Sequence, residues 1–155
     1  MLFRIVLYIF ADENTIFQCK KVHLKSEASG RYLQATGFQM DAQGYKTTTN
    51  STFLVSKMTG STIALKTHDS RKVISKSPPE YTLVDIADDT MLDNTQFIVK
   101  ELNEKRISLQ SDDLFYLSSD SNGFISQTMN SQDSLLTTNE IWTFNCFEGK
   151  SDGYT

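Results

Sequence analysis

The amino-acid sequence predicts an all-β fold built from a threefold internal repeat. Its clearest mark is an asparagine followed three residues later by an aromatic ring, at Phe53, Phe97 and Trp142, with steps of 44 and 45 residues between successive rings. Two more patterns keep nearly the same spacing. One is a triplet with apolar residues at its first and third positions, at 22–24, 63–65 and 107–109; the other is a pair, Tyr-Leu in two of its three copies, at 32–33, 72–73 and 116–117. Three marks that recur together indicate three copies of one structural unit.

Each unit alternates with a period of two rather than 3.6. Val22-His23-Leu24 places two apolar side chains on one face of a strand, and the other two triplets repeat this spacing. Turn-forming residues such as Ser29-Gly30 and Asn122-Gly123 separate the short runs. We therefore expect about a dozen strands and no amphipathic helix, with a single helical turn at 88–92.

Three such units must share one core, because no unit covers its apolar face alone. A β-propeller needs at least ~4 blades, which leaves the β-trefoil, a six-stranded barrel capped by three hairpins. We expect it to span residues 17–147, with repeats at 17–59, 60–104 and 105–147, followed by a tail at 148–155. The recurring apolar residues should form the core: Leu24, Leu33, Phe53, Leu65, Val73, Phe97, Leu109, Leu117 and Trp142.

The N-terminal extension, residues 1–16, lies outside the repeat. Met1 to Ala11 holds one basic residue, an apolar run and a final small residue, which is typical of a short signal peptide. The alternative, which we favour, is an extra apolar strand on the barrel. The run is too short to cross a bilayer as a helix, so no membrane span is expected.

Part of the repeat resembles a known family. Ser26-x-x-x-Gly30-Arg31-Tyr32-Leu33 follows the first triplet, and Ser111 to Tyr116-Leu117 follows the third. Both are similar to the recurring unit of fascin-like trefoils and of amaranthin-type agglutinin domains, over residues 17–147. Repeat two departs from it, with Thr67 in place of the serine and Arg71-Lys72-Val73 in place of the tyrosine–leucine step. The resemblance implies a partner that is a carbohydrate, a glycoprotein or actin.

No catalytic or metal-binding constellation is apparent. His23 and His68 are the two histidines; we expect His23 to point outward from its strand and His68 to lie in a turn. Asp69 follows His68, but no nucleophile elbow accompanies the pair. We expect no enzyme activity, no cofactor and no metal. The net charge of −4 disfavours a nucleic-acid partner, which would require a positive field.

Two features bear on the cellular compartment. Cys19 and Cys146 stand near the two ends of the repeat region and would be neighbours in a closed barrel, where a disulfide would join them. We favour the alternative in which both cysteines are buried free thiols of an intracellular protein, so a cytoplasmic location is slightly preferred to a secreted one. Asn50-Ser51-Thr52 is a glycosylation sequon, relevant only to a secreted chain.

A non-enzymatic binding protein is the function that these observations favour, with a carbohydrate as ligand on a shallow lobe. Repeat three is the preferred lobe, through Asp112, Phe115, Asn122 and Phe124. Turn-borne aromatic residues are the candidate stacking platforms: Tyr45, Tyr81, Phe115, Phe124 and Tyr154. The alternatives are a fascin-like actin-binding module, for which a homodimer would supply the second site that crosslinking needs, and a secreted trefoil cytokine or protease inhibitor.

Overall fold

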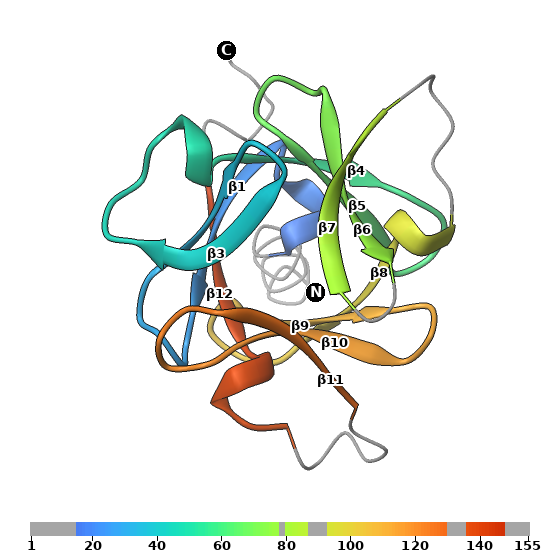
Figure 1. Cartoon of the computed structure of the whole chain (residues 1–155). Helices are drawn as coiled ribbons and strands as arrows, with labels where there is room; N and C mark the ends of the chain where they lie inside the picture. The colour runs from blue at the N-terminus through green and yellow to red at the C-terminus, as the bar shows by residue number, and fades with distance from the viewer. Residues whose placement is uncertain (1–14, 78–79, 87–92, 130–135, 148–155) are drawn as a thin grey trace, which may run out of the picture.

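The computed structural model describes residues 15–77, 80–86, 93–129 and 136–147, in which twelve strands form one continuous antiparallel sheet (Figure 1). The strands are β1 (Lys21–Ser26), β2 (Tyr32–Thr36), β3 (Gln39–Gly44), β4 (Phe53–Lys57), β5 (Thr62–Thr67), β6 (Lys72–Ser77), β7 (Glu80–Asp85), β8 (Phe97–Glu101), β9 (Arg106–Ser111), β10 (Phe115–Ser119), β11 (Ile125–Met129) and β12 (Trp142–Cys146). The 3₁₀ turns within these described residues are η1 (Ile16–Gln18), η2 (Thr49–Ser51), η3 (Asp93–Thr95) and η5 (Thr138–Glu140).

Six strands close into a barrel. β1 pairs with β4, β4 with β5, β5 with β8, β8 with β9, β9 with β12 and β12 with β1. The three repeats form three lobes, numbered one to three in chain order. The hairpins β2–β3, β6–β7 and β10–β11 are set around the barrel, one to each lobe (Figure 1). This is the predicted β-trefoil. Closure leaves the barrel strands with no open edge.

The pairing register confirms the threefold repeat residue by residue. Phe53 lies opposite Val22, Phe97 opposite Ile63 and Trp142 opposite Ile107. All nine predicted core residues are buried, and none is more than 3% exposed. Each large apolar side chain buried in this way contributes roughly 1.5–3 kcal/mol. The Trp142 ring N–H also donates to the Leu117 carbonyl at 3.0 Å, so the ring is buried without an unsatisfied donor.

The alignment of repeats that matched Lys72-Val73 to Tyr32-Leu33 was wrong by one residue. β1 pairs with β2 through Lys25 and Tyr32, and the matching contact in lobe two joins Lys66 to Val73. Val73 is therefore the counterpart of Tyr32, and Ile74 that of Leu33. Lobes one and two have the same spacing at this point, and lobe three is one residue shorter, since its matching contact joins Gln110 to Tyr116. Repeat two therefore carries Val73-Ile74 where the other two repeats carry tyrosine and leucine.

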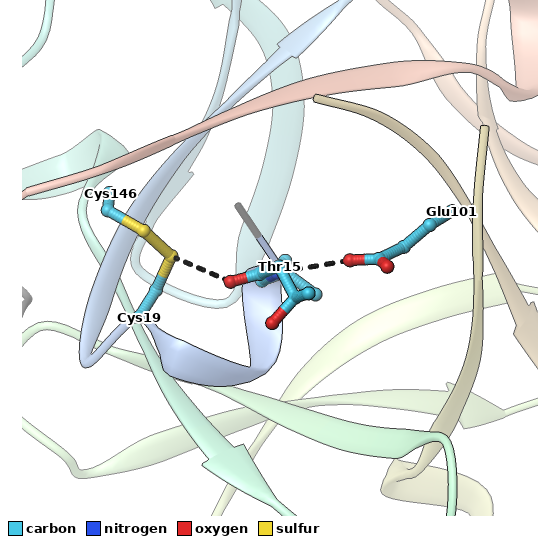
Figure 2. Close-up of a disulfide and its surroundings, with 5 residues drawn as sticks. Thr15, Cys19, Glu101 and Cys146 are labelled. Atoms are coloured by element: carbon cyan, nitrogen blue, oxygen red, sulfur yellow. Dashed lines mark hydrogen bonds between the residues drawn. A yellow bond between two sulfur atoms is a disulfide. The ribbon is translucent and has the colours of Figure 1, made fainter. Parts of the chain in front are cut away.

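The preference for free thiols was also wrong, because Cys19 and Cys146 form a disulfide with 5.3 Å between their Cα atoms. Closing the barrel makes the first and last strands neighbours, with Val22 opposite Cys146. Figure 2 shows the bond, with Thr15 beside Cys19 and Glu101 nearby. The crosslink joins residues 127 positions apart. Loops of this length correspond to about 4–5 kcal/mol in the chain-entropy description.

Four predictions fall on residues outside the described ranges: the N-terminal apolar strand, the helical turn at 88–92, the tail at 148–155 and the Tyr154 platform. Within the described ranges, none of the helices is long and apolar enough to cross a membrane.

Candidate functional site

The residues predicted for lobe three are divided between the two ends of one hairpin. Asp112 and Phe115 lie where the chain enters β10, whereas Asn122 and Phe124 lie in the turn that leads to β11. The register runs from Phe115 opposite Met129 to Ser119 opposite Ile125. A strand of this length spans roughly 13–16 Å. The structure therefore places two separate pairs on lobe three.

The Phe115 end is occupied by a lysine from lobe two. The Lys76 ammonium lies 4.3 Å from the centre of the Phe115 ring and 2.6 Å from Asp113 Oδ2. Lys76 is 2% exposed, whereas the Asp113 side chain is 35% exposed. Burial opposes ionisation of Asp113, but hydrogen bonds from Lys76, Ser111 and the Phe115 N–H outweigh it and hold the pKa of that carboxyl below its usual value. Phe115 is thus part of a packed ion-pair site.

Tyr81 is not the exposed platform that the sequence suggested, because it is buried. Its hydroxyl lies 2.8 Å from Ser111 Oγ and donates to the Phe115 carbonyl at 3.1 Å. Burial raises the pKa of the Tyr81 hydroxyl, against the lowering effect of its hydrogen bond with Ser111. The ring takes part in lining a hollow of about 440 Å³ where the three hairpins meet, with Met40 and Ile125 from equivalent positions.

The other end of the hairpin is a rigid turn packed on lobe one. Asp120 Oδ1 accepts from the N–H groups of Asn122 and Phe124, at 2.9 and 3.0 Å. Gly123 has a φ of +89°, and a Cβ there would lie 2.6 Å from the Ala42 carbonyl oxygen. The Ala42 N–H in turn donates to the Gly123 carbonyl at 2.8 Å. Only glycine allows this approach.

The contact between these lobes creates a surface site, which we call the lobe one–three seam: Arg31, Gln43, Tyr45, Asn122 and Phe124. Arg31 donates to the Tyr45 hydroxyl at 3.3 Å and to the Asn122 carbonyl at 3.4 Å, and Gln43 donates to the same carbonyl at 3.0 Å. The Arg31 guanidinium carbon lies 5.2 Å from the Tyr45 ring centre. Tyr45 is 83% exposed and Phe124 60%. The seam offers aromatic surface beside hydrogen-bonding groups.

Sequence reasoning found three of the five seam residues. Tyr45, Asn122 and Phe124 stand in turns, where exposed side chains are expected. Arg31 and Gln43 were missed, since they come from lobe one and meet lobe three only after folding. Arg31 does stand inside the recurring Gly30-Arg31-Tyr32 step, but a single sequence does not indicate what it faces.

The two histidines differ in burial: His23 is buried and His68 is exposed. His23 was expected to point into solvent, but it is buried, with Nε2 3.3 Å from Thr52 Oγ1 and its ring centre 4.7 Å from that of Phe147. Burial lowers its pKa. The expectation failed because the η2 loop and the residue after β12 cover the outer face of β1.

His68 lies in the β5–β6 turn and is exposed, as expected. Its neighbour Asp69 is held by the turn itself: Thr67 Oγ1 donates to it at 2.7 Å and the Arg71 N–H at 3.1 Å. These two hydrogen bonds keep the pKa of the Asp69 carboxyl below its usual value. Among the described residues, no three His, Cys, Asp or Glu side chains are grouped to hold a metal ion.

Comparison with known proteins identifies the fold. No family model matches the chain, and no curated protein matches it. A solved structure does: the crystal structure of a designed threefold-symmetric protein, ThreeFoil, matches with a TM-score of 0.65 over 81% of this chain and 97% of that one. The chain folds as a β-trefoil. At 14% sequence identity, this likeness concerns the fold alone.

Proposed function

We propose that this protein is a non-enzymatic carbohydrate-binding module and that the lobe one–three seam is its ligand site. The observation that carries the proposal is Tyr45, a ring 83% exposed and set beside the donors of Arg31. A sugar presents an apolar face that stacks on such a ring and hydroxyls that bond to adjacent polar groups. The trefoil fold is consistent with a binding role, since its turns vary on a constant barrel.

The seam is open and shallow, so weak binding is expected. A free energy of ~4–8 kcal/mol per site corresponds to millimolar to micromolar affinity. Binding to a glycoprotein with several sugar units would gain avidity only if more than one lobe took part or if the chain formed a homodimer.

The disulfide favours a lectin over the actin-binding alternative. Disulfides persist in secreted proteins and are rare in the cytosol, where a fascin-like module would work. Cys19–Cys146 and the exposed Asn50 of the sequon both agree with a secreted, amaranthin-type agglutinin. A secreted cytokine or protease inhibitor would share both features, but it would not need the Tyr45 platform.

NMR titration of the whole protein with simple sugars tests the proposal. We expect amide shifts at Tyr45, Asn122 and Phe124, and an affinity about tenfold lower in Tyr45→Ala and Phe124→Ala, a loss of ~1.4 kcal/mol. Phe38→Ala is the matched control, because Phe38 is 59% exposed and lies outside the seam. The sugar should be recovered chemically unchanged.

Three results would contradict the proposal: no shifts with any glycan, equal losses in the control, or shifts on addition of actin alone. Shifts on addition of actin alone would favour the alternative function, a fascin-like actin-binding module.

A further inference from the structure

Two positions of the repeat mark the junction where the hairpin of one lobe meets a turn of the next lobe. The first is the hairpin position that carries, in lobes one to three, Ala35, Lys76 and Ser119. The second lies two residues after the end of β1, β5 and β9 and carries, in the same order, Ala28, Asp69 and Asp113. Taken across adjacent lobes, one junction has a lysine with an aspartate, one has an aspartate alone, and one has neither.

The junction between lobes two and three shows which group fills this space. Lys76 Nζ lies 2.6 Å from Asp113 Oδ2 and 4.3 Å from the centre of the Phe115 ring, and Lys76 is 2% exposed. The other carboxylate oxygen, Oδ1, holds the turn, because it accepts from Ser111 Oγ and from the Phe115 N–H. The two oxygens of Asp113 thus have separate partners, the backbone turn for one and an ammonium group for the other.

The junction between lobes one and two has the same carboxylate without the lysine. Asp69 Oδ1 accepts from Thr67 Oγ1 and from the Arg71 N–H, as Asp113 Oδ1 does in its own turn. Within the described part of the chain, Asp69 Oδ2 accepts no hydrogen bond and joins no ion pair. The hairpin position holds the short Ala35, beside a cavity of about 110 Å³. We call this cavity the Asp69 pocket, lined by Ala35, Gly37, Thr49, Asn50, Thr52, Thr67, His68, Asp69 and Lys72.

We propose that the Asp69 pocket binds a ligand that presents a primary ammonium group on an unbranched alkyl chain, as a lysine side chain does. The neighbouring junction already holds this group against the equivalent carboxylate oxygen. Hydrogen bonds from Thr67 and from the Arg71 N–H keep the pKa of the Asp69 carboxyl below its usual value, so the group is ionised at neutral pH. Because Asp69 is exposed, the ion pair is weak in water, and millimolar affinity is expected.

Two positive charges near the pocket act against a cation. Arg71 belongs to the same turn as Asp69, and Lys72 takes the place that Phe115 has in lobe three, one residue before the contact with the preceding strand. The Lys72 ammonium lies 4.8 Å from the centre of the Phe38 ring and forms no ion pair with Asp69. Lys72 should therefore weaken the binding of a cation without occupying Asp69 Oδ2, whereas a site for an anion would depend on Lys72 in the opposite sense.

The test is an NMR titration of the whole protein at pH 8 with n-butylammonium chloride, Nα-acetyl-lysine methylamide and n-butanol. A primary amine is protonated at this pH, as lysine is. Both amines, or one of them, should shift the amides of residues 67–71 and bind at least tenfold more tightly than n-butanol. The tighter amine shows whether the site prefers a free amine or a lysine side chain within a peptide. Binding should weaken as salt is added, because the charges are exposed. If neither amine binds more tightly than n-butanol, the proposal is wrong.

Substitutions locate the bound amine. Asp69→Asn should lower amine affinity at least tenfold, and its amide oxygen can still accept the hydrogen bonds of the turn. Glu80→Gln makes the same change of charge at an exposed residue of β7, outside the pocket, and should leave binding unchanged. Lys72→Gln should raise the affinity. Full binding in Asp69→Asn, an equal loss in Glu80→Gln or a loss in Lys72→Gln would overturn the proposal. Tyr45→Ala should retain amine binding, because the pocket and the seam share no residue and this inference does not rest on the proposed function.

A further variant tests the comparison of junctions without a ligand. Ala35→Lys installs the lysine that the lobe-two hairpin carries, and Ala35→Met adds a chain of similar length without charge. Both should block amine binding, but only the lysine should pair with Asp69 Oδ2. The pKa of the Asp69 carboxyl, followed by ¹³C NMR, should therefore be lower in Ala35→Lys than in Ala35→Met. The same pKa in both variants, or full amine binding in Ala35→Lys, would show that the two junctions are not equivalent and would overturn the proposal.

Discussion

The turn after β5 and the turn after β9 are built alike, yet one opens into a pocket and the other is closed. In lobe two, Asp69 accepts from Thr67 Oγ1 at 2.7 Å and from the Arg71 N–H at 3.1 Å. In lobe three, Asp113 accepts from Ser111 at 2.7 Å and from the Phe115 N–H at 3.4 Å. The same hydrogen-bonded turn is therefore present twice.

The difference comes from the preceding hairpin. Ala35 lies opposite Met40, and its counterpart Lys76 lies opposite Tyr81. Ala35 lines the open pocket beside Asp69, whereas Lys76 extends to Asp113 and fills the equivalent space. One residue in each hairpin thus distinguishes the open turn from the filled one. The repeat keeps the hydrogen bonds of the turn the same, and a single side chain changes the space beside it.

The two turns can be compared only if the three lobes match residue by residue. The substitution Trp142→Ala tests this threefold register and has the largest expected effect on stability. Truncating a buried large aromatic ring should cost about 3–5 kcal/mol of unfolding free energy, measured by urea denaturation. Trp142→Phe, which installs the residue that the other two lobes carry, should cost much less. If Trp142→Ala left stability unchanged, the ring would not belong to the core.

Asp113→Ala should come next, with a loss of about 3 kcal/mol, because it leaves the buried Lys76 ammonium without its partner. The matched variant Asp69→Ala, in the open turn, should cost clearly less. Adding Lys76→Ala to Asp113→Ala should restore part of the stability, since the unpaired charge is then removed. Equal losses of stability in the two aspartate variants would show that the hydrogen bonds of the turn, and not the ion pair with Lys76, account for the effect of Asp113→Ala.

Spacing and alternation predicted the barrel because core positions repeat in all three units. Leu24, Leu65 and Leu109 recur in sequence, and the register places them at equivalent points. The one-residue error at Val73 arose because this turn has the same length in lobes one and two but is one residue shorter in lobe three, which periodicity alone does not locate.

The candidate sites were harder to predict, because they depend on where different lobes meet. Asn122 and Arg31 are far apart in sequence and belong to different repeats, so nothing local joins them. His23 alternates like a surface residue, but the later Thr52 and Phe147 cover it. The disulfide was foreseen as geometry and rejected only on an assumption about the compartment.

The smallest expected effect is a pH dependence of stability that arises from His23. Its folded-state pKa is below 6.5 because the ring is buried, so the unfolded chain binds the proton more readily. This contribution to stability is complete above pH 6.5 and decreases as the pH falls below it. Denaturation midpoints at pH 7.5 and 5.5 should therefore differ more in the parent protein than in the His23→Ala variant, which installs the alanine that lobe two carries at the matching position, Ala64.

Carboxyl groups with lowered pKa values, such as Asp69 and Asp113, titrate below this window and do not mask the effect. An equal difference in His23→Ala would assign the pH dependence to other groups and leave His23 with a purely structural contact to Thr52.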